Sequence, residues 1–567
     1  MAIQDKRIAE TANNLLNHLD SCATSILFSY DRVITLIFQF SLQHSDMSWF
    51  TPTTTQLSEQ QRNNGLKYMF HDGLCSHAMT LLVTGSFLPG IALALGASNF
   101  VIGILASLAP MSQMAQIPAI LLVEYVGLRK LITVIAALIS RIALLFVGII
   151  PFYIPQDLQI AVFMLLMVIF FACGAVGGCS WSSWIKDIVP EKTIGTYLAK
   201  RLAAATALGA ALTIIAGFCV DSLTVLFGEP ARAYAVIFYI AALFGIAGVK
   251  ALSKVAEPQM PNRNPDTSWI SSLLEPVKDP NFRRLIMFSF SWSFTVIMSG
   301  AFFAVYMLQR IGLSMTVVIT LAVLSQITNI YFFKVWGNIA DRYSNKSVLN
   351  VSLPLFILIL LLYPFTTLPG PHTFTLPLLI VIHIIGGIST AGFNLCAANI
   401  ALRLAPHHKA TAYLGANSFI SGLAATIAPI LGGLIGAVFV THEISLKIFY
   451  TANIDLPGGG ISIPAMSFRG LDFVFIFAAF IGFYAIHRLS LVEEEGTVSE
   501  SEVRDQVFTS VRQSLVNTSS FSIGIRRMTA FPYDLLRKKT RSTYGRLTSI
   551  SRRKKAVRTT ENKDNME

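Results

Sequence analysis

The sequence predicts an all-α integral membrane protein with twelve transmembrane helices, arranged as two parallel repeats of six. Three observations indicate this fold. Of the 567 residues, 53% are apolar, only 13% are charged and the mean hydropathy is +0.60, whereas a soluble globular chain is about 25% charged. The apolar residues form long runs, and about 20 such residues in a helix cross a hydrocarbon core. Several motifs of the first half also recur in the second half at one constant offset. This composition excludes soluble enzymes, disordered chains and fibrous proteins.

Twelve apolar runs are long enough to cross a bilayer. In chain order they span roughly 66–94, 98–122, 130–152, 157–184, 202–227, 231–252, 284–309, 312–336, 347–368, 374–402, 410–440 and 469–490. Proline and glycine occur inside several of them, which a membrane helix tolerates because neighbouring helices satisfy the freed backbone groups. The even number places both termini on one side of the membrane.

Lysine and arginine gather in the connections after spans 2, 4, 6, 8 and 10. The connection after span 4, for example, holds Lys186, Lys192, Lys200 and Arg201. The connections on the opposite side hold only Arg232, Arg310, Lys447 and Arg469. Cytoplasmic loops carry the excess of positive residues. We therefore expect the protein to lie in a cell membrane with both termini on the cytoplasmic side. If the chain is bacterial, this is the inner membrane.

Polar extensions flank the spans. In residues 1–64, the apolar run 25–42 is interrupted by Asp31 and Arg32, which favours a helix lying in the membrane interface over a thirteenth span. The cytoplasmic tail, 491–567, holds twelve Lys/Arg and one acid within 526–558. This basic stretch is either a solvated tail or a segment attracted to anionic lipids, at about 1 kcal/mol per basic residue near the surface.

Matching loops indicate an internal duplication. Pro190 precedes the pair Tyr197-Leu198, and Pro406 precedes the pair Tyr413-Leu414 at the same spacing. The same offset in residue number relates Gln113 to Asn329 and Lys130 to Lys346. Parallel repeats of this kind are one recurring plan of transporters. We therefore predict a first half at 65–252, a linker at 253–283 and a second half at 284–490.

The second-half loop, G337-N-I-A-D341-R342-Y-S-N-K346, resembles the signature G-x-x-x-D-R-x-G-R-K of the major facilitator superfamily. Serine and asparagine replace its second glycine and the following arginine. The first-half loop keeps Glu124, Gly127, Arg129 and Lys130, whereas Ile120 and Tyr125 depart from the pattern. The run from Trp181 to Gly195 is similar to poorly characterised bacterial members. The resemblance covers roughly 66–490 and implies transport by alternating access.

Asp341 is the central residue of a candidate conformational latch. Its carboxylate can pair with an arginine or accept bonds from a helix N-terminus, worth about 0.3–1 kcal/mol when exposed. A pair that forms in only one conformer biases a two-state equilibrium, and the resemblance implies that this conformer is the outward-open one. The alternative is that these charges only set topology. The candidate latch residues are Glu124, Arg129, Lys130, Gly337, Asp341, Arg342 and Lys346.

Spans 1 and 3 place ionisable side chains at membrane depth, where each costs at least about 2.5–3.5 kcal/mol. Counted from Leu66, Asp72 lies ~9 Å and His77 ~16 Å along span 1, and counted from Lys130, Arg141 lies ~16 Å along span 3. Asp72 is the candidate protonation site and Arg141 the candidate anchor for an anionic solute. A structural ion pair is the alternative for both. The resemblance implies that first helices line the cavity and that third helices lie outside it.

Four further side chains are candidates for contacting the solute. His383 has Met167 at the equivalent position of the first half, and such asymmetry suits an asymmetric ligand. Trp292, flanked by serines in span 7, offers a ring for stacking. Gln113 and Asn329 offer amides. The alternatives are a hydrogen-bonded core histidine, small serines that serve only helix packing, and amides that hold helices together.

No enzyme motif, nucleotide-binding loop or metal-ligand spacing occurs among the residues, so we expect no cofactor and no enzymatic activity. The six cysteines give no sign of a disulfide framework. We predict a gradient-driven transporter of a small organic solute, anionic or amphipathic, with protons and anionic lipids as partners and no nucleic acid. The alternatives are an uncoupled facilitator or drug exporter, and a receptor or scaffold that signals through its tail.

Overall fold

The computed structural model describes residues 57–494, except 115–118, 120–121, 124–125, 190–193, 259–275, 368–371, 407–409 and 451–460. Three predicted features lie outside the described residues: the interfacial helix at 25–42, the basic stretch 526–558 and Glu124.

The first part of the chain forms a bundle of helices, which we call the first bundle. It consists of α2 (Glu59–Val83), α3 (Phe87–Ala94), α4 (Asn99–Met114), α6 (Arg129–Val147), α7 (Ile150–Tyr153), α8 (Gln156–Ile188), α9 (Ile194–Phe227) and α10 (Pro230–Leu252). A capping box at Ser58 and Gln61 begins α2. Between α2 and α3 the chain bends by 42°. Gly85 lies at this bend with a φ of +59°, a conformation that glycine adopts without strain.

The second bundle follows the same order of long helices. It consists of α12 (Pro280–Val305) with the π-helical turn η2 (Tyr306–Ile311), α13 (Met315–Arg342), α14 (Asn345–Leu362) with η3 (Tyr363–Thr367), α15 (Thr375–Leu404), α16 (Ala410–Val438) with η4 (Phe439–Thr441), and α17 (Leu471–Ser490). Side chains of Asp279, Ser314 and Ser344 accept backbone N–H bonds at the starts of α12, α13 and α14. These short polar residues are the preferred helix N-caps.

An antiparallel hairpin connects α16 to α17, and the sequence analysis did not predict it. Strand β1 (Glu443–Tyr450) pairs with β2 (Ile461–Arg469), from Glu443 opposite Arg469 to Tyr450 opposite Ile461. The register shifts between Leu446 and Lys447. Strand-favouring aromatic and β-branched residues within 443–450 explain the strand.

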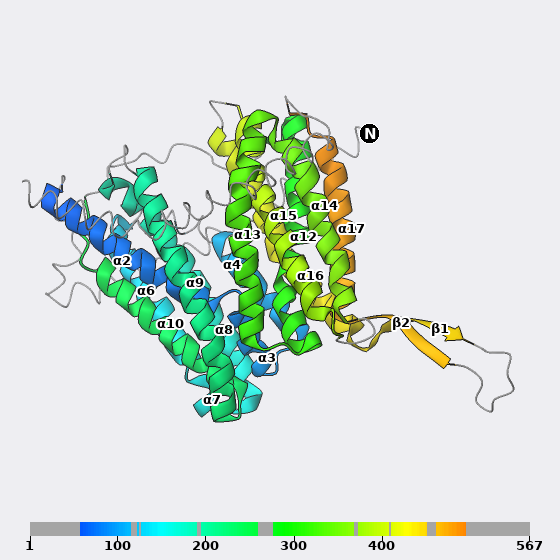
Figure 1. Cartoon of the computed structure of the whole chain (residues 1–567). Helices are drawn as coiled ribbons and strands as arrows, with labels where there is room; N and C mark the ends of the chain where they lie inside the picture. Colours follow the sequence, from blue (N-terminus) through cyan, green and yellow to red (C-terminus); the bar gives the residue numbers. More distant parts are fainter. Residues whose placement is uncertain are drawn as a thin grey trace, which may run out of the picture.

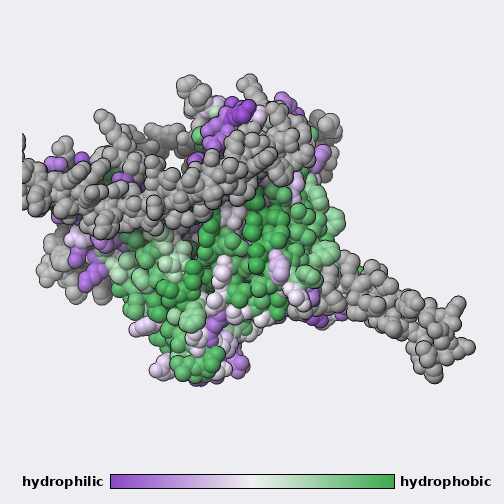
Figure 2. Space-filling model, viewed as in Figure 1, coloured by the Kyte–Doolittle hydropathy of each residue, from purple (hydrophilic) through white to green (hydrophobic). Residues whose placement is uncertain are grey.

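The predicted all-α membrane fold is confirmed, with the hairpin as an addition. Among the described residues, ten helices are long and apolar enough to cross a membrane, and the bent pair α2–α3 makes an eleventh. The remaining predicted span, 98–122, begins with the short apolar helix α4. Figure 2 shows the apolar residues as a continuous band across the middle of one face. Exposed Leu165, Phe218 and Phe480 belong to such lipid-facing surface.

The two bundles meet at one end of the molecule and diverge toward the other (Figure 1). We call the end with β1 and β2 the hairpin end, and the end where α2 begins and α17 finishes the linker end. At the hairpin end α4 packs against α16. An ideal Cβ on Gly103 would lie 2.3 Å from the carbonyl oxygen of Pro429, and one on Gly433 would lie 2.6 Å from that of Asn99. Glycine therefore permits backbone contact between the bundles.

Candidate functional site

The candidate latch of the second bundle is mainly helical. The sequence analysis placed Asp341 in a loop past the end of span 8, but α13 continues to Arg342, so Gly337 and Asp341 lie within the helix. Tyr343 and Ser344 alone connect α13 to α14. Asp341 is exposed and forms no ion pair with a described residue, while the Arg342 guanidinium lies 5.3 Å from the centre of the Tyr343 ring. In this conformer the Asp341 carboxylate is available to a partner.

Arg129 is buried at the start of α6 instead of lying in an exposed loop. Its N–H donates to Glu257 Oε1 at 2.6 Å. Its guanidinium pairs with Asp187 and donates to the carbonyl oxygen of Pro258 at 3.0 Å. Lys130 donates its own backbone N–H to Glu257. The carboxylate after α10 therefore caps α6, a favourable place for negative charge.

Glu494 performs the same task in the second bundle. Its Oε2 accepts from the N–H of Lys346 at 2.7 Å, and its Oε1 accepts from the side chain of Asn345 at 2.9 Å. Arg403 lies 3.4 Å from Glu494 Oε1. The ammonium of Lys346 donates to the carbonyl oxygens of Ser490 and Val492 at 2.9 and 2.6 Å. The segment after α17 thereby caps α14.

The two capping networks occupy equivalent places in the repeat. The offset that relates the two halves takes Arg129 to Asn345, Lys130 to Lys346, and Asp187 to Arg403. The charge at the end of the fourth helix is reversed, because Asp187 contacts an arginine and Arg403 contacts a glutamate. The predicted latch residues Arg129, Lys130 and Lys346 therefore hold each bundle together at its linker end.

Glu257, Asp187 and Glu494 were not predicted as site residues. Their signal was present in the sequence: Glu257 and Glu494 lie a few residues after the sixth and twelfth spans, and Asp187 follows the fourth. Whether these carboxylates reach the starts of α6 and α14 depends on how the helices of each bundle pack together. The spacing of residues along the sequence does not show this. Burial raises the pKa of the Glu257 carboxyl, and the backbone bonds from Lys130 and Arg129 oppose that shift. Removing one partner from such a buried group costs about 3–5 kcal/mol.

Asp341→Asn is expected to slow transport about twofold to fivefold while the amount of protein in the membrane stays near normal. The exposed carboxylate pairs with no cation among the described residues, but it can stabilise the conformer in which the linker end closes. Initial rates and abundance should be measured together. Asp157→Asn, at an exposed position in the first turn of α8, is the control. Equal rates for the two variants would remove Asp341 from the mechanism.

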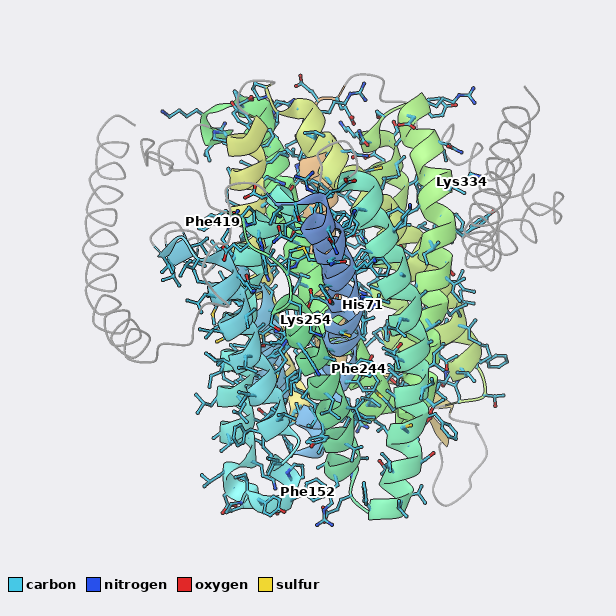
Figure 3. All side chains as sticks on the ribbon, turned by 90° about the vertical axis from the view of Figure 1, so that its left-hand side faces the viewer. His71, Phe152, Phe244, Lys254, Lys334 and Phe419 are labelled. Carbon is cyan, nitrogen blue, oxygen red and sulfur yellow. The ribbon has the colours of Figure 1, made fainter. Side chains whose placement is uncertain are left out.

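Asp72 lies at the centre of a polar cluster inside the first bundle. It is buried on α2, which packs against α9 and α10, and Figure 3 shows the preceding residue, His71, partway along this helix. The Asp72 Oδ2 atom lies 3.6 Å from Nη2 of Arg201, and the side chains are 5% and 21% exposed. Ser76 donates to Asp72 Oδ1 at 2.9 Å. A buried carboxylate thus has a cationic partner that still reaches the surface.

Arg201 is the member of this cluster that the sequence analysis missed, because it was counted only as a topology charge. Its Nε donates to the carbonyl oxygen of Met69 at 3.3 Å, and its guanidinium lies 4.5 Å from the centre of the Trp181 ring. Gly73 makes this approach feasible, since a Cβ there would lie 1.9 Å from Arg201 Nε. Cation–π stacking holds the guanidinium plane in place.

Arg141 reaches the same cluster from α6. Its Nη2 donates to Ser76 Oγ at 3.3 Å, so Ser76 connects Arg141 to Asp72. Two glycines of α10 leave the required space: a Cβ on Gly245 would lie 2.5 Å from Arg141 Cγ, and one on Gly248 would lie 3.0 Å from Asp72 Oδ1. One carboxylate therefore faces two guanidinium groups in the first bundle.

The remaining candidates are not hydrogen-bonded to this cluster, although His77 lies close enough to Arg201 to interact with its charge. His77 is half-buried beside α9, where a Cβ on Gly209 would lie 3.6 Å from the His77 Cδ2 atom. His383 donates to the Leu379 carbonyl of its own helix at 2.8 Å. Asn329 donates to Thr390 at 2.9 Å and so joins α13 to α15, whereas Gln113 is exposed near the end of α4.

Trp292 is completely buried in the second bundle. Its ring lies 5.5 Å from that of Phe356 and 5.6 Å from that of Phe393, centre to centre. Its indole N–H has no hydrogen-bond partner among the described residues. The structure therefore places Trp292 in the core of the bundle, where its ring is not exposed to a solute in the way that the sequence analysis predicted.

Asp472 is another buried carboxylate that the sequence analysis missed. It lies at the start of α17, accepts from the hydroxyl of Tyr306 at 2.7 Å and from the N–H of Arg469 at 2.9 Å, and is 3.4 Å from Arg310 Nη2. These contacts fix η2 against α17 at the hairpin end. In the part of the chain that the structure describes, no three His, Cys, Asp or Glu side chains are placed to bind a metal ion.

A family model described as Major Facilitator Superfamily matches residues 73–429 and 335–531. The crystal structure of the nucleoside transporter NupG is 15% identical with a TM-score of 0.55, covering 77% of this chain and 100% of that one. The D-xylose-proton symporter is 12% identical with a TM-score of 0.53, covering 78% and 99%. A bacterial homologue of the human lysosomal transporter Spinster is 14% identical with a TM-score of 0.52, covering 81% of this chain and 98% of that one. These similarities show the fold. The comparison with curated proteins gives no match.

Proposed function

Since the chain belongs to the major facilitator superfamily, which makes it a multi-pass membrane transporter of a solute and not an enzyme, we propose a specific transport reaction. In this proposal the transport of a small organic anion is coupled to the transport of protons. Alternating access would occur by rocking of the two bundles about a solute held between them. The observation that supports this proposal is the cluster of Asp72 with Arg201 and Arg141.

The charge of the cluster depends on one proton. With Asp72 ionised, one carboxylate faces two guanidinium groups and the cluster carries a net charge of +1. With Asp72 protonated, both guanidinium groups remain charged and the cluster carries +2. Arginine holds carboxylates and phosphates through paired N–H bonds. Protonation of Asp72 therefore favours binding of an anion by Arg201, whose side chain is 21% exposed. Solute and proton then bind together.

The orientation proposed here follows the distribution of lysine and arginine. The linker end holds most of these residues, so it would face the cytoplasm. The bundles diverge at this end (Figure 1), and the conformer would then be open to the inside.

Anionic lipids are the proposed partners of the basic tail.

The test begins with a comparison of metabolites retained and released by cells with and without the protein. Anions that differ are then tried on purified protein in liposomes. We expect a proton gradient to accumulate such an anion above its equilibrium concentration, because a proton enters with each solute. An anion that only equilibrates under the same gradient would contradict the coupling and leave an uncoupled facilitator.

A further inference from the structure

Asp221 of α9 contacts the first turn of α13 and so joins the two bundles at the hairpin end. Its Oδ1 accepts from the N–H of Met315 at 2.9 Å, and its Oδ2 accepts from the N–H of Thr316 at 2.8 Å. The hydroxyl of Ser314 accepts from the next amide at 3.5 Å. A carboxylate of the first bundle therefore completes the cap of a helix in the second bundle.

The first N–H groups of a helix have no partner within the helix, and they carry partial positive charge. A carboxylate placed across two of them satisfies both donors and complements that charge. When the bundles separate at this end, Asp221 leaves and water must take its place. The contact therefore favours the conformer in which the hairpin end is closed.

The packing beside Asp221 allows α9 to lie close to α13. Gly217 lies four residues earlier, on the same face of α9. A Cβ on Gly217 would lie 3.3 Å from Ile319 Cγ1 and 3.5 Å from the Cα of Thr316. A side chain larger than a methyl group at this position would press on α13, so glycine is compatible with the short distance at which the carboxylate reaches the backbone of α13.

We propose that Asp221 is a gating residue of the transport cycle: it holds the hairpin end closed by capping α13 and must release that helix for the hairpin end to open. Asp341, at the linker end, is exposed in the same conformer. The two carboxylates would therefore act in alternation, one at each end. The proposal rests on rocking of the bundles and is independent of proton coupling through Asp72.

The proposal is tested by measuring distances between pairs of spin labels with electron–electron double resonance. The labels are attached to full-length protein whose six native cysteines have been replaced. Tyr153 and Ile444 are exposed at the hairpin end in different bundles, and Gln60 and Ser490 are exposed at the linker end. In Asp221→Ala we expect the population with a longer distance at the hairpin end to rise about tenfold. The linker-end pair should gain a shorter distance. Asp157→Ala, which removes an exposed carboxylate at the same end, should match the parent.

The acceptor side gives an independent variant. Met315 is the first residue of α13, where proline is tolerated, and the preceding Ser314 already has the extended backbone that proline requires. Met315→Pro removes one of the two N–H donors to Asp221, while Met315→Ala removes the side chain and keeps the donor. We expect Met315→Pro to open the hairpin end about threefold more than Met315→Ala does.

Equal distance distributions for Asp221→Ala and Asp157→Ala would overturn the proposal. So would equal distributions for Met315→Pro and Met315→Ala, because the cap would then make no difference. If Asp221→Ala does not fold, the comparison of the two Met315 variants decides by itself. Opening in both series supports Asp221 as the gating residue.

Discussion

Asp72→Asn is expected to abolish proton-driven accumulation of the solute while leaving exchange of solute between the two sides intact. Asparagine resembles the protonated acid in shape but cannot titrate. The cluster would keep its net charge of +2 throughout the cycle, with Arg201 and Arg141 free to hold an anion. Accumulation under a proton gradient and exchange without a gradient should both be measured in liposomes. The accumulation ratio should fall to about one.

The main rival explanation is a structural ion pair. In that case Asp72→Asn lowers abundance, because it leaves the charge of Arg201 without its partner at a cost of about 3–5 kcal/mol. The double variant Asp72→Asn with Arg201→Gln would then recover folding without recovering transport. Asp157→Asn serves as the control for loss of an exposed carboxylate. Full accumulation by Asp72→Asn would end the coupling proposal.

Gly433→Leu is expected to slow transport strongly by favouring the conformer in which the hairpin end is open. A Cβ at Gly433 would lie 2.6 Å from the carbonyl oxygen of Asn99 and 3.1 Å from the Cα of Phe100, both backbone atoms of the other bundle. Backbone cannot turn aside as a flexible side chain can, so α4 and α16 must move apart. Overpacking of this kind costs about 1–3 kcal/mol, which moves a balanced equilibrium by roughly 5-fold to 160-fold.

Gly422→Leu is the matched control on the same helix, because no atom lies within 4 Å of its Cβ position. It should transport at close to the parent rate. Uptake rates and the label distance between Tyr153 and Ile444 should be recorded for both variants. Normal transport by Gly433→Leu, at normal abundance, would show that close contact of α4 and α16 is not needed in the cycle.

The sequence by itself determined the class of protein, the positions of most spans and the duplication. Long apolar runs indicate membrane helices because lipid excludes unsatisfied backbone, so the ends of α8, α10, α15 and α16 agree with the predicted runs to within a few residues. The constant offset between the halves also located equivalent residues. Arg129 and Asn345, which begin α6 and α14, both receive a carboxylate that follows the last helix of their bundle.

Side-chain partners were decided only by the tertiary structure. Asp72 pairs directly with Arg201 and reaches Arg141 through Ser76, although depth alone favoured Arg141. Depth follows from counting residues along one helix, whereas a partner depends on how neighbouring helices rotate and cross. Apolar runs carry little information about that rotation, because lipid tails and helix interiors are equally apolar. Close contacts at small residues fix it instead, as Gly73 and Gly248 do around Arg201 and Asp72.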